Sequence, residues 1–202
     1  MKVSTLVHHD AAGHGARSRD CVGLLQKVLD EHDPGVLEDL NRVAHLATST
    51  ARYLGLDDED VERVELAARL HDVGKLAIPD TILGKQGPLD AGEWVIMRTH
   101  AEIGERILAS TPSLAHLASL VRSHHEHYDG TGYPDRLAGE EIQLGARILS
   151  VCAAFVAMMR HRPFSDAITV EEALSELKRC SGTQFDPQVV DAFARLMHSA
   201  LA

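Results

Sequence analysis

The sequence is poor in aromatic residues, in cysteine and in long apolar runs, and each shortage excludes a class of protein. Aromatic residues make up only 4% of the 202 residues, so the core must be mainly aliphatic, which favours packed helices over a β-sandwich. The three cysteines are widely spaced and odd in number, which predicts reduced thiols. The longest apolar run, Ile148 to Met159, is too short to span a bilayer, and the N-terminus lacks the apolar stretch of a signal peptide. We therefore expect a cytoplasmic protein.

Positive charge is also scarce. The chain has 20 lysines and arginines against 30 aspartates and glutamates, and its formal net charge is −10. A broad DNA-binding surface or an anionic membrane is therefore not an expected partner. An anionic substrate would need a local cationic site, such as a bound metal.

Apolar residues recur at helical spacing through most of the chain, and no alternating strand pattern is longer than a few residues. Asp90 is the predicted N-cap of one of these helices. We predict an all-α fold with one domain of about eight helices over residues 18–202, and a loose tail over residues 1–17. The predicted helices lie around residues 21–29, 36–54, 61–70, 94–108, 113–125, 144–160, 169–180 and 187–200.

The stretch LAARLHDVGK places His71 and Asp72 at the end of an apolar helix. A lone histidine there would ordinarily be a hydrogen-bonded core residue. The adjacent carboxylate needs a strong partner, because burying an unpaired charge is costly. A bound cation is the simplest partner of both side chains, and imidazole with carboxylate suits iron, manganese, zinc or nickel. Lys75 follows closely enough to contact a phosphate at that ion.

Three more histidines could complete such a site. His100 lies on the predicted inward face of its helix, and His124 and His125 lie at a helix end before the turn DGTGYPD. Neighbouring residues on a regular helix point about 100° apart, so both can reach one cluster only if the helix ends or distorts there. The alternative is a pair of surface histidines that cap a helix C-terminus.

The motifs HDVGK, THAEIG and HHEHYDGTGYP, in this order and spacing, resemble those of the HD-GYP family, a branch of the HD phosphohydrolases. The stretches IPDTIL and GTQFDP resemble the family as well, and the likeness covers roughly residues 19–197. Members are all-helical, bind two or three metals, often iron or manganese, and hydrolyse cyclic di-GMP to pGpG or GMP. The resemblance implies an HD-type helical bundle that acts as a cyclic di-GMP phosphodiesterase in bacterial second-messenger signalling.

The resemblance also implies roles for the matching residues. The implied metal ligands are His71, Asp72, His100, His124 and His125. Catalysis would depend on His71, Asp72 and Lys75, and the nucleotide would be bound by Lys75, Gly132, Tyr133, Pro134 and Arg162. We expect one or two divalent ions, with iron or manganese ahead of zinc or nickel, and cyclic di-GMP or a related guanine nucleotide as ligand. A homodimer or a signalling protein is a further candidate partner.

The sequence departs from the family where its members carry metal ligands. Asp39 stands where the family has a histidine, so it is a candidate ligand with a shorter side chain. Gly35 stands where three-metal members have a glutamate. The family's ADVFDAL reads CAAFVAM here, with Ala153 and Val156 in place of two aspartates. We therefore expect one weakened metal position and no third metal.

These features leave two hypotheses open. The first is a slow cyclic di-GMP phosphodiesterase in which Asp39 or water completes the weakened metal position. The second is a catalytically degenerate HD-GYP module that binds a nucleotide or a partner protein and acts as a regulator.

Overall fold

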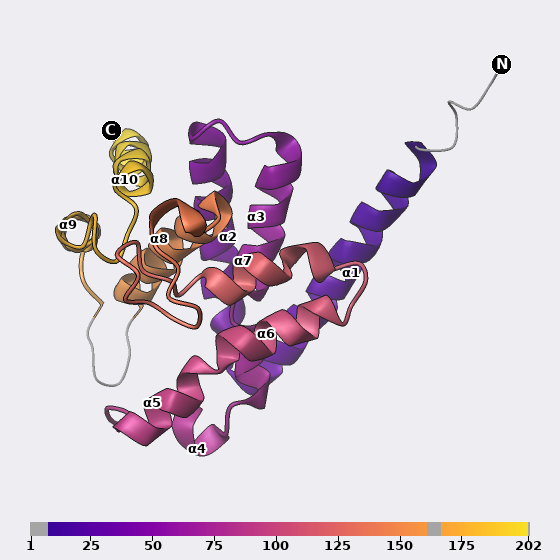
Figure 1. Ribbon diagram of the computed structural model, residues 1–202, viewed down its shortest axis with the longest axis horizontal. Helices are drawn as coiled ribbons and strands as arrows, with labels where there is room; N and C mark the ends of the chain where they lie inside the picture. Colours follow the sequence, from indigo (N-terminus) through magenta and orange to yellow (C-terminus); the bar gives the residue numbers. More distant parts are fainter. Residues whose placement is uncertain (1–7, 161–166, 202) are drawn as a thin grey trace.

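Helices α2 (Val36–Tyr53) and α3 (Asp58–Leu70) stand side by side at the centre of the fold in this computed structural model (Figure 1). The structure describes residues 8–160 and 167–201, with side chains over 17–160 and 167–199. α2 buries three alanines completely, and such small side chains let neighbouring helices approach closely. Helix α8 (Leu144–Met159), rich in buried aliphatic residues, packs against both α2 and α3.

Two further helices flank this centre on opposite sides (Figure 1). α1 (His8–His32) packs along α3 and α2. α10 (Pro187–Leu201) contacts α2, α8 and α9 (Val170–Arg179). The rings of Phe155 and Phe193, 5.0 Å apart between centroids, join α8 to α10 inside the core.

A third group of short helices lies across the lower part of the molecule in Figure 1. Helix α6 packs against both the 3-10 helix η1 and α7, and α5 and α4 extend from its start. The bounds are η1 (Val73–Ala77), α4 (Asp80–Leu83), α5 (Ala91–Arg98), α6 (His100–Ala109), η2 (Ala115–Leu117), α7 (Ala118–Ser123) and η3 (Gly139–Glu141).

The predicted all-α fold is confirmed. The described residues form helices with two isolated β-bridges and no strand. Asp90 caps α5 as predicted: its carboxylate accepts a hydrogen bond from the Glu93 N–H at 2.9 Å, and the Glu93 side chain accepts one from the Asp90 N–H. In the described part of the chain, no helix is both long enough and apolar enough to cross a membrane.

Several helix boundaries differ from the sequence prediction, and the helix expected over 113–125 is observed as η2 followed by α7. α1 starts at His8, within the stretch expected to be a loose tail; the division of the chain into tail and domain stays a prediction. The helix expected over 94–108 is broken at Thr99 into α5 and α6. There the Thr99 hydroxyl donates to the Ile96 carbonyl at 2.7 Å, and His100 Nδ1 bonds the Met97 carbonyl at 2.8 Å. These two side chains occupy carbonyls of the last turn of α5, so the helical ladder is interrupted directly before His100.

Candidate metal centre

His71 and Asp72 form the corner between α3 and η1. The N-cap Asp57 starts α3, and the apolar stripe of this helix carries the chain into the core as far as Leu70. His71 is buried, and its Nδ1 lies 2.8 Å from the Ala68 carbonyl oxygen. Its Nε2 therefore turns toward Asp72, 3.5 Å from the carboxylate.

Gly74 allows this corner to dock against α6. A Cβ at this position would lie 1.9 Å from the carbonyl oxygen of His100 and 2.7 Å from the backbone nitrogen of Gly104, distances that backbone atoms cannot accommodate. Because glycine lacks that atom, η1 packs directly on the start of α6. His100 Nε2 then lies 3.7 Å from Asp72 Oδ1, although 28 residues separate the two in the chain.

The two adjacent histidines both reach the same cluster, because α7 ends at Ser123 as the prediction required. His124 lies edge-on to His71, with 5.3 Å between ring centroids, and is 5.5 Å from His100. The ring of His125 lies beside that of His124, with 4.0 Å between centroids, and its Nε2 is 3.2 Å from His100 Nε2.

Three of the four histidines are held by the same local device. His71, His100 and His124 each place Nδ1 within hydrogen-bond distance of the carbonyl oxygen three residues earlier, which leaves Nε2 as the free ring nitrogen. Such a bond fixes the tautomer and orientation of a metal-binding imidazole. Ligand atoms of His100, His124 and His125 lie within 4.8 Å of one another, so one ion could contact all three.

His124 shows most directly that a metal fits here. Its Nε2 is buried and has no hydrogen-bond partner among the described residues. A buried nitrogen left without a partner costs free energy, and a bound cation would satisfy its lone pair. A neutral histidine set beside a carboxylate is also the donor set that divalent transition metals take.

The electrostatics of the cluster favour the metal-binding forms of these groups. Burial lowers the pKa of His124 and of His125 well below the ordinary value, and it lowers that of His100 against the opposing effect of Asp72. Burial would raise the pKa of Asp72, but Lys75 and His71 hold it well below its usual range. At neutral pH these three imidazoles are neutral and the carboxylate is charged, which is what metal binding requires.

Lys75 completes the corner. Its Nζ donates to Asp72 Oδ2 at 2.7 Å, and about a third of its side chain is exposed. The lysine therefore stands between the carboxylate and the solvent, where it can meet an incoming anion. The predicted proximity of His71, Asp72 and Lys75 is thus present in the structure.

The glycine-rich turn brings Tyr133 over the cluster. The Tyr133 N–H donates to the His125 carbonyl oxygen at 3.2 Å, and the two rings stack with 4.8 Å between centroids and 21° between planes. A Cβ on Gly132 would lie 2.2 Å from the His127 nitrogen, so only glycine lets the turn fold this closely. Tyr133 is joined to Pro134 by a cis peptide bond, and burial raises the pKa of its phenol, which stays protonated.

Sequence reasoning missed the residues that hold this turn. Glu126 is buried, and its two carboxylate oxygens accept hydrogen bonds from the N–H groups of Asp135 at 2.6 Å and Leu137 at 3.1 Å. Arg122 donates two hydrogen bonds to the Asp135 carboxylate, and it donates a third to the Glu105 carboxylate on α6. The one signal in the sequence was a glutamate directly after the paired histidines, which could equally have been exposed.

The positions where the sequence departs from the HD-GYP pattern offer little to a metal. The Asp39 carboxylate lies 3.0 Å from Arg160 in an ion pair, and it is not part of the histidine cluster. Ala153 and Val156 pack with the hydrophobic core. Asp39 as a ligand stays a prediction, and Arg162, the predicted phosphate-binding residue, lies outside the described residues.

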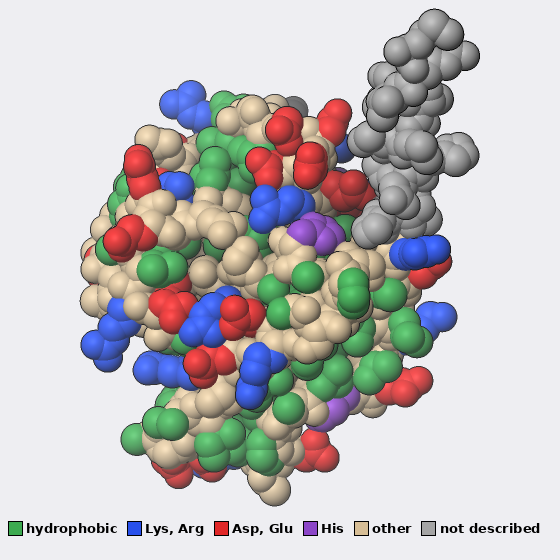
Figure 2. All heavy atoms as spheres, turned by 45° about the vertical axis from the view of Figure 1, so that its right-hand side comes forward, with side chains coloured by type: hydrophobic (Ala, Val, Ile, Leu, Met, Phe, Trp, Pro, Cys, Tyr) green, Lys and Arg blue, Asp and Glu red, His purple; other side chains and the backbone are tan. Residues whose placement is uncertain are grey.

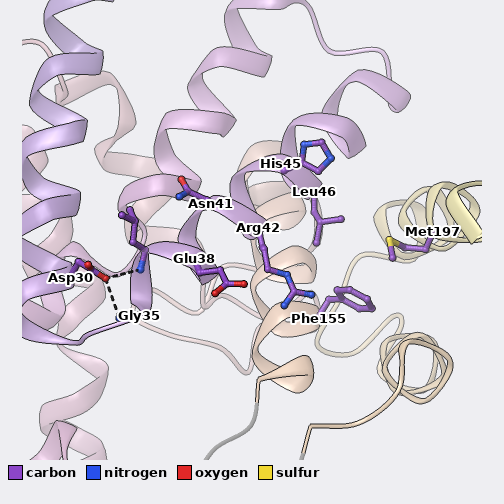
Figure 3. Close-up of a pocket in the computed structure, with 10 residues that line it drawn as sticks. Asp30, Gly35, Glu38, Asn41, Arg42, His45, Leu46, Phe155 and Met197 are labelled. Carbon is purple, nitrogen blue, oxygen red and sulfur yellow. Dashed lines mark hydrogen bonds between the residues drawn. The ribbon is translucent and has the colours of Figure 1, made fainter.

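A separate pocket of about 730 Å³ opens beside α2 (Figure 3). Its walls come from the end of α1, α2, α8 and α10, with Glu38 and Arg42 on one side and Phe155 and Met197 on the other. None of the clustered histidines lines it. The pocket is therefore distinct from the candidate metal centre.

Comparison with known proteins agrees with this geometry. A family model described as "HD domain" matches residues 23–189. The cyclic di-GMP phosphodiesterase response regulator RpfG of Xanthomonas campestris pv. campestris is 41% identical over 181 residues, which are 89% of this chain and 48% of that protein. The 3'3'-cGAMP-specific phosphodiesterase 2 of Vibrio cholerae is 40% identical over 154 residues, 75% of this chain and 30% of that protein. The chain thus spans about half the length, or less, of these relatives.

A solved structure shares the fold. Bd1817, an HDG"Y"P protein from Bdellovibrio bacteriovorus, matches with a TM-score of 0.70 over 91% of this chain and 64% of that chain. The two sequences are 16% identical, so this likeness bears on the fold alone.

Proposed function

Because the chain belongs to the HD domain family, we propose that it is a metal-dependent phosphodiesterase of the HD-GYP type, which hydrolyses cyclic di-GMP to pGpG or GMP. The observation that carries the proposal is a cluster built from three separate segments. Ligand atoms of His100, His124 and His125 lie within 4.8 Å of one another, and the Asp72 carboxylate lies 3.7 Å from His100 and 3.5 Å from His71. Relatives named as cyclic di-GMP phosphodiesterases support the choice of substrate.

These residues would hold a divalent ion, for which iron or manganese is our first choice. When bound, such an ion polarises a phosphate oxygen and lowers the pKa of water to near neutrality. The protein supplies the orientation: Nδ1 contacts with carbonyl oxygens fix three imidazoles, so their Nε2 atoms need no rearrangement to bind. Asp72 supplies a negative charge that balances part of the ion's charge.

Other residues would bind the substrate. Lys75 carries a positive charge at the exposed edge of the cluster, where a phosphodiester oxygen would lie. Tyr133 covers the histidines with a flat ring and keeps its proton, so it can donate a hydrogen bond but adds no negative charge beside a phosphate. Gly132 lets this ring come close.

The second candidate function is a degenerate module that binds a cyclic dinucleotide without hydrolysing it. The observation in its favour concerns the positions on α2 and α8 where the HD-GYP pattern has ligands: Asp39 pairs with Arg160, and Ala153 packs against the core. Location in the cytoplasm and a homodimer or signalling partner stay predictions from the sequence.

One experiment separates these functions. Protein purified without oxygen is incubated with cyclic di-GMP and Mn²⁺ or Fe²⁺, and pGpG and GMP are measured by chromatography. We expect slow release that His71→Ala and Asp72→Ala each reduce by more than about 100-fold, since a metal ligand matters more than its supporting shell. Release no faster than in these variants, with binding retained in calorimetry, would establish the degenerate module instead.

A further inference from the structure

Helix α5 exposes an unusual amount of apolar surface. None of its eight residues is buried, and Trp94, Val95 and Ile96 are 47%, 68% and 42% exposed. Hydrophobic side chains gather at this lower end of the molecule, where α4 and α5 lie (Figure 2). Trp94 is the single tryptophan of the chain. A contiguous exposed apolar surface is typical of a ligand-binding or interaction site.

A chain of stacked groups leads from this surface to the histidines. Arg98 lies one helical turn after Trp94, and its guanidinium carbon is 6.0 Å from the Trp94 ring centroid and 5.3 Å from that of Tyr133. Tyr133 in turn stacks on His125, whose Nε2 meets His100. We call Trp94, Arg98, Tyr133 and His125 the aromatic ladder. Trp94 and Arg98 are exposed and Tyr133 and His125 are half-buried, so the ladder runs from solvent to the candidate metal centre.

The chemistry of the ladder suits a nucleotide better than a protein. A flat indole and a planar guanidinium are the groups on which nucleobases stack, and the guanidinium also binds phosphate oxygens. In the part of the chain that the structure describes, no carboxylate forms an ion pair with Arg98, so its charge is available to an anion. Lys75 supplies a second cation beside the histidines, in a chain whose net charge is −10. Arg98 and Tyr133 connect the apolar surface of α5 to the candidate metal centre.

We propose that Trp94 and Arg98 form a purine nucleotide subsite beside the candidate metal centre. One guanine base of the cyclic dinucleotide stacks on Trp94, and Arg98 contacts a phosphate of the same ligand. The other half of the ligand then reaches Lys75 and Tyr133. This subsite rests on the proposed function, since it holds the part of the substrate that does not react.

The single tryptophan makes the subsite directly observable. Metal-loaded protein is mixed with cyclic di-GMP, and Trp94 fluorescence is read within the first seconds, while calorimetry measures binding independently. Stacking on guanine should quench the emission with the same midpoint as the calorimetric curve. The matched control is the double variant Trp94→Phe and Tyr53→Trp, which moves the only tryptophan to an exposed position at the end of α2. Its emission should not change.

Substitution of the arginine supplies a second readout. Arg98→Ala should weaken binding about tenfold, as expected for loss of a stacking and phosphate contact, while Arg98→Lys should recover only part of it. Arg106→Ala, which removes one exposed positive charge from α6, is the control and should bind like the wild type.

The outcomes separate the subsite from the function. In one outcome, the protein binds cyclic di-GMP in calorimetry and hydrolyses it, while Trp94 emission stays unchanged and Arg98→Ala binds like the wild type. That outcome would overturn the subsite and leave the phosphodiesterase in place. Absence of both binding and hydrolysis of cyclic di-GMP would overturn both. Quenching at the calorimetric midpoint without hydrolysis would support the subsite in the degenerate module.

Discussion

Two regions of the molecule compare differently with the HD-GYP pattern. The histidine cluster, where α3, α6 and α7 come together, matches it, whereas helices α2 and α8 depart from it. In the first region, His71, His100 and His124 are buried and oriented by carbonyl groups, and a nitrogen of His124 lacks a partner. In the second, Asp39 forms an ion pair with Arg160, and Ala153 packs against the core.

The difference teaches that this fold tolerates Ala153 and Val156, which cannot bind a metal, at positions where the HD-GYP pattern has aspartates. Ala153 and Val156 are compatible with α8 because they add apolar contacts in a helix that is already rich in them. His124 cannot be explained in that way, since its Nδ1 contacts a carbonyl oxygen but its buried Nε2 has no partner among the described residues, which costs free energy. The first region therefore carries a free-energy cost at His124 that a bound ion would offset, whereas Ala153 and Val156 in the second region contribute to packing.

The largest expected effect contrasts a ligand from each region. His124→Ala should weaken the affinity for the metal by more than about 100-fold, because His124 offers a buried nitrogen with no competing partner. Asp39→Ala should change metal affinity by less than about threefold, because Arg160 already engages the carboxylate. Elemental analysis and competition with a chelator measure both. Equal losses in the two variants would show that Asp39 leaves its ion pair to bind the metal.

Restoring the second region sharpens the same comparison. The double variant Ala153→Asp and Asp39→His returns two ligands that the family carries there. We expect metal content to rise from near one to near two ions per chain and cyclic di-GMP turnover to rise by about 10- to 100-fold. The double variant Asp39→Asn and Ala153→Asn serves as the control, because it changes the same two positions without introducing an imidazole or a carboxylate. A wild-type protein that already binds two ions would contradict the comparison.

A smaller effect concerns the support of Tyr133. Glu126→Ala should lower the free energy of unfolding by about 2 kcal/mol, because two backbone N–H groups lose a charged acceptor in a buried place. Urea denaturation measures this. Glu140→Ala, on the exposed 3-10 helix η3, is the matched control and should change stability by less than about 0.5 kcal/mol. If Glu126→Ala leaves stability unchanged, water replaces the carboxylate and the turn does not depend on it.

Several features of the site could be predicted from particular residues. Asp90 with Glu93 three positions later predicts a helix start from local hydrogen bonding alone, and the structure has that start. The need for a helix end at His124 followed from helix geometry, and α7 ends there. The break at Thr99 could not be seen, because the competition of two side chains for carbonyl groups leaves the apolar pattern of residues 94–108 intact.

The sequence by itself determined the helical class and the kinds of donor atom available, because periodicity, capping and residue type act over a few neighbouring residues. Only the tertiary structure decided which side chains face one another: Asp39 with Arg160, Glu126 with the turn, Arg98 with Tyr133. Some of these pairs join segments that are distant in the chain. Others involve a turn, whose sequence has no hydrophobic periodicity from which its contacts could be predicted. Their choice depends on how the helices pack, and packing is a property of the whole core.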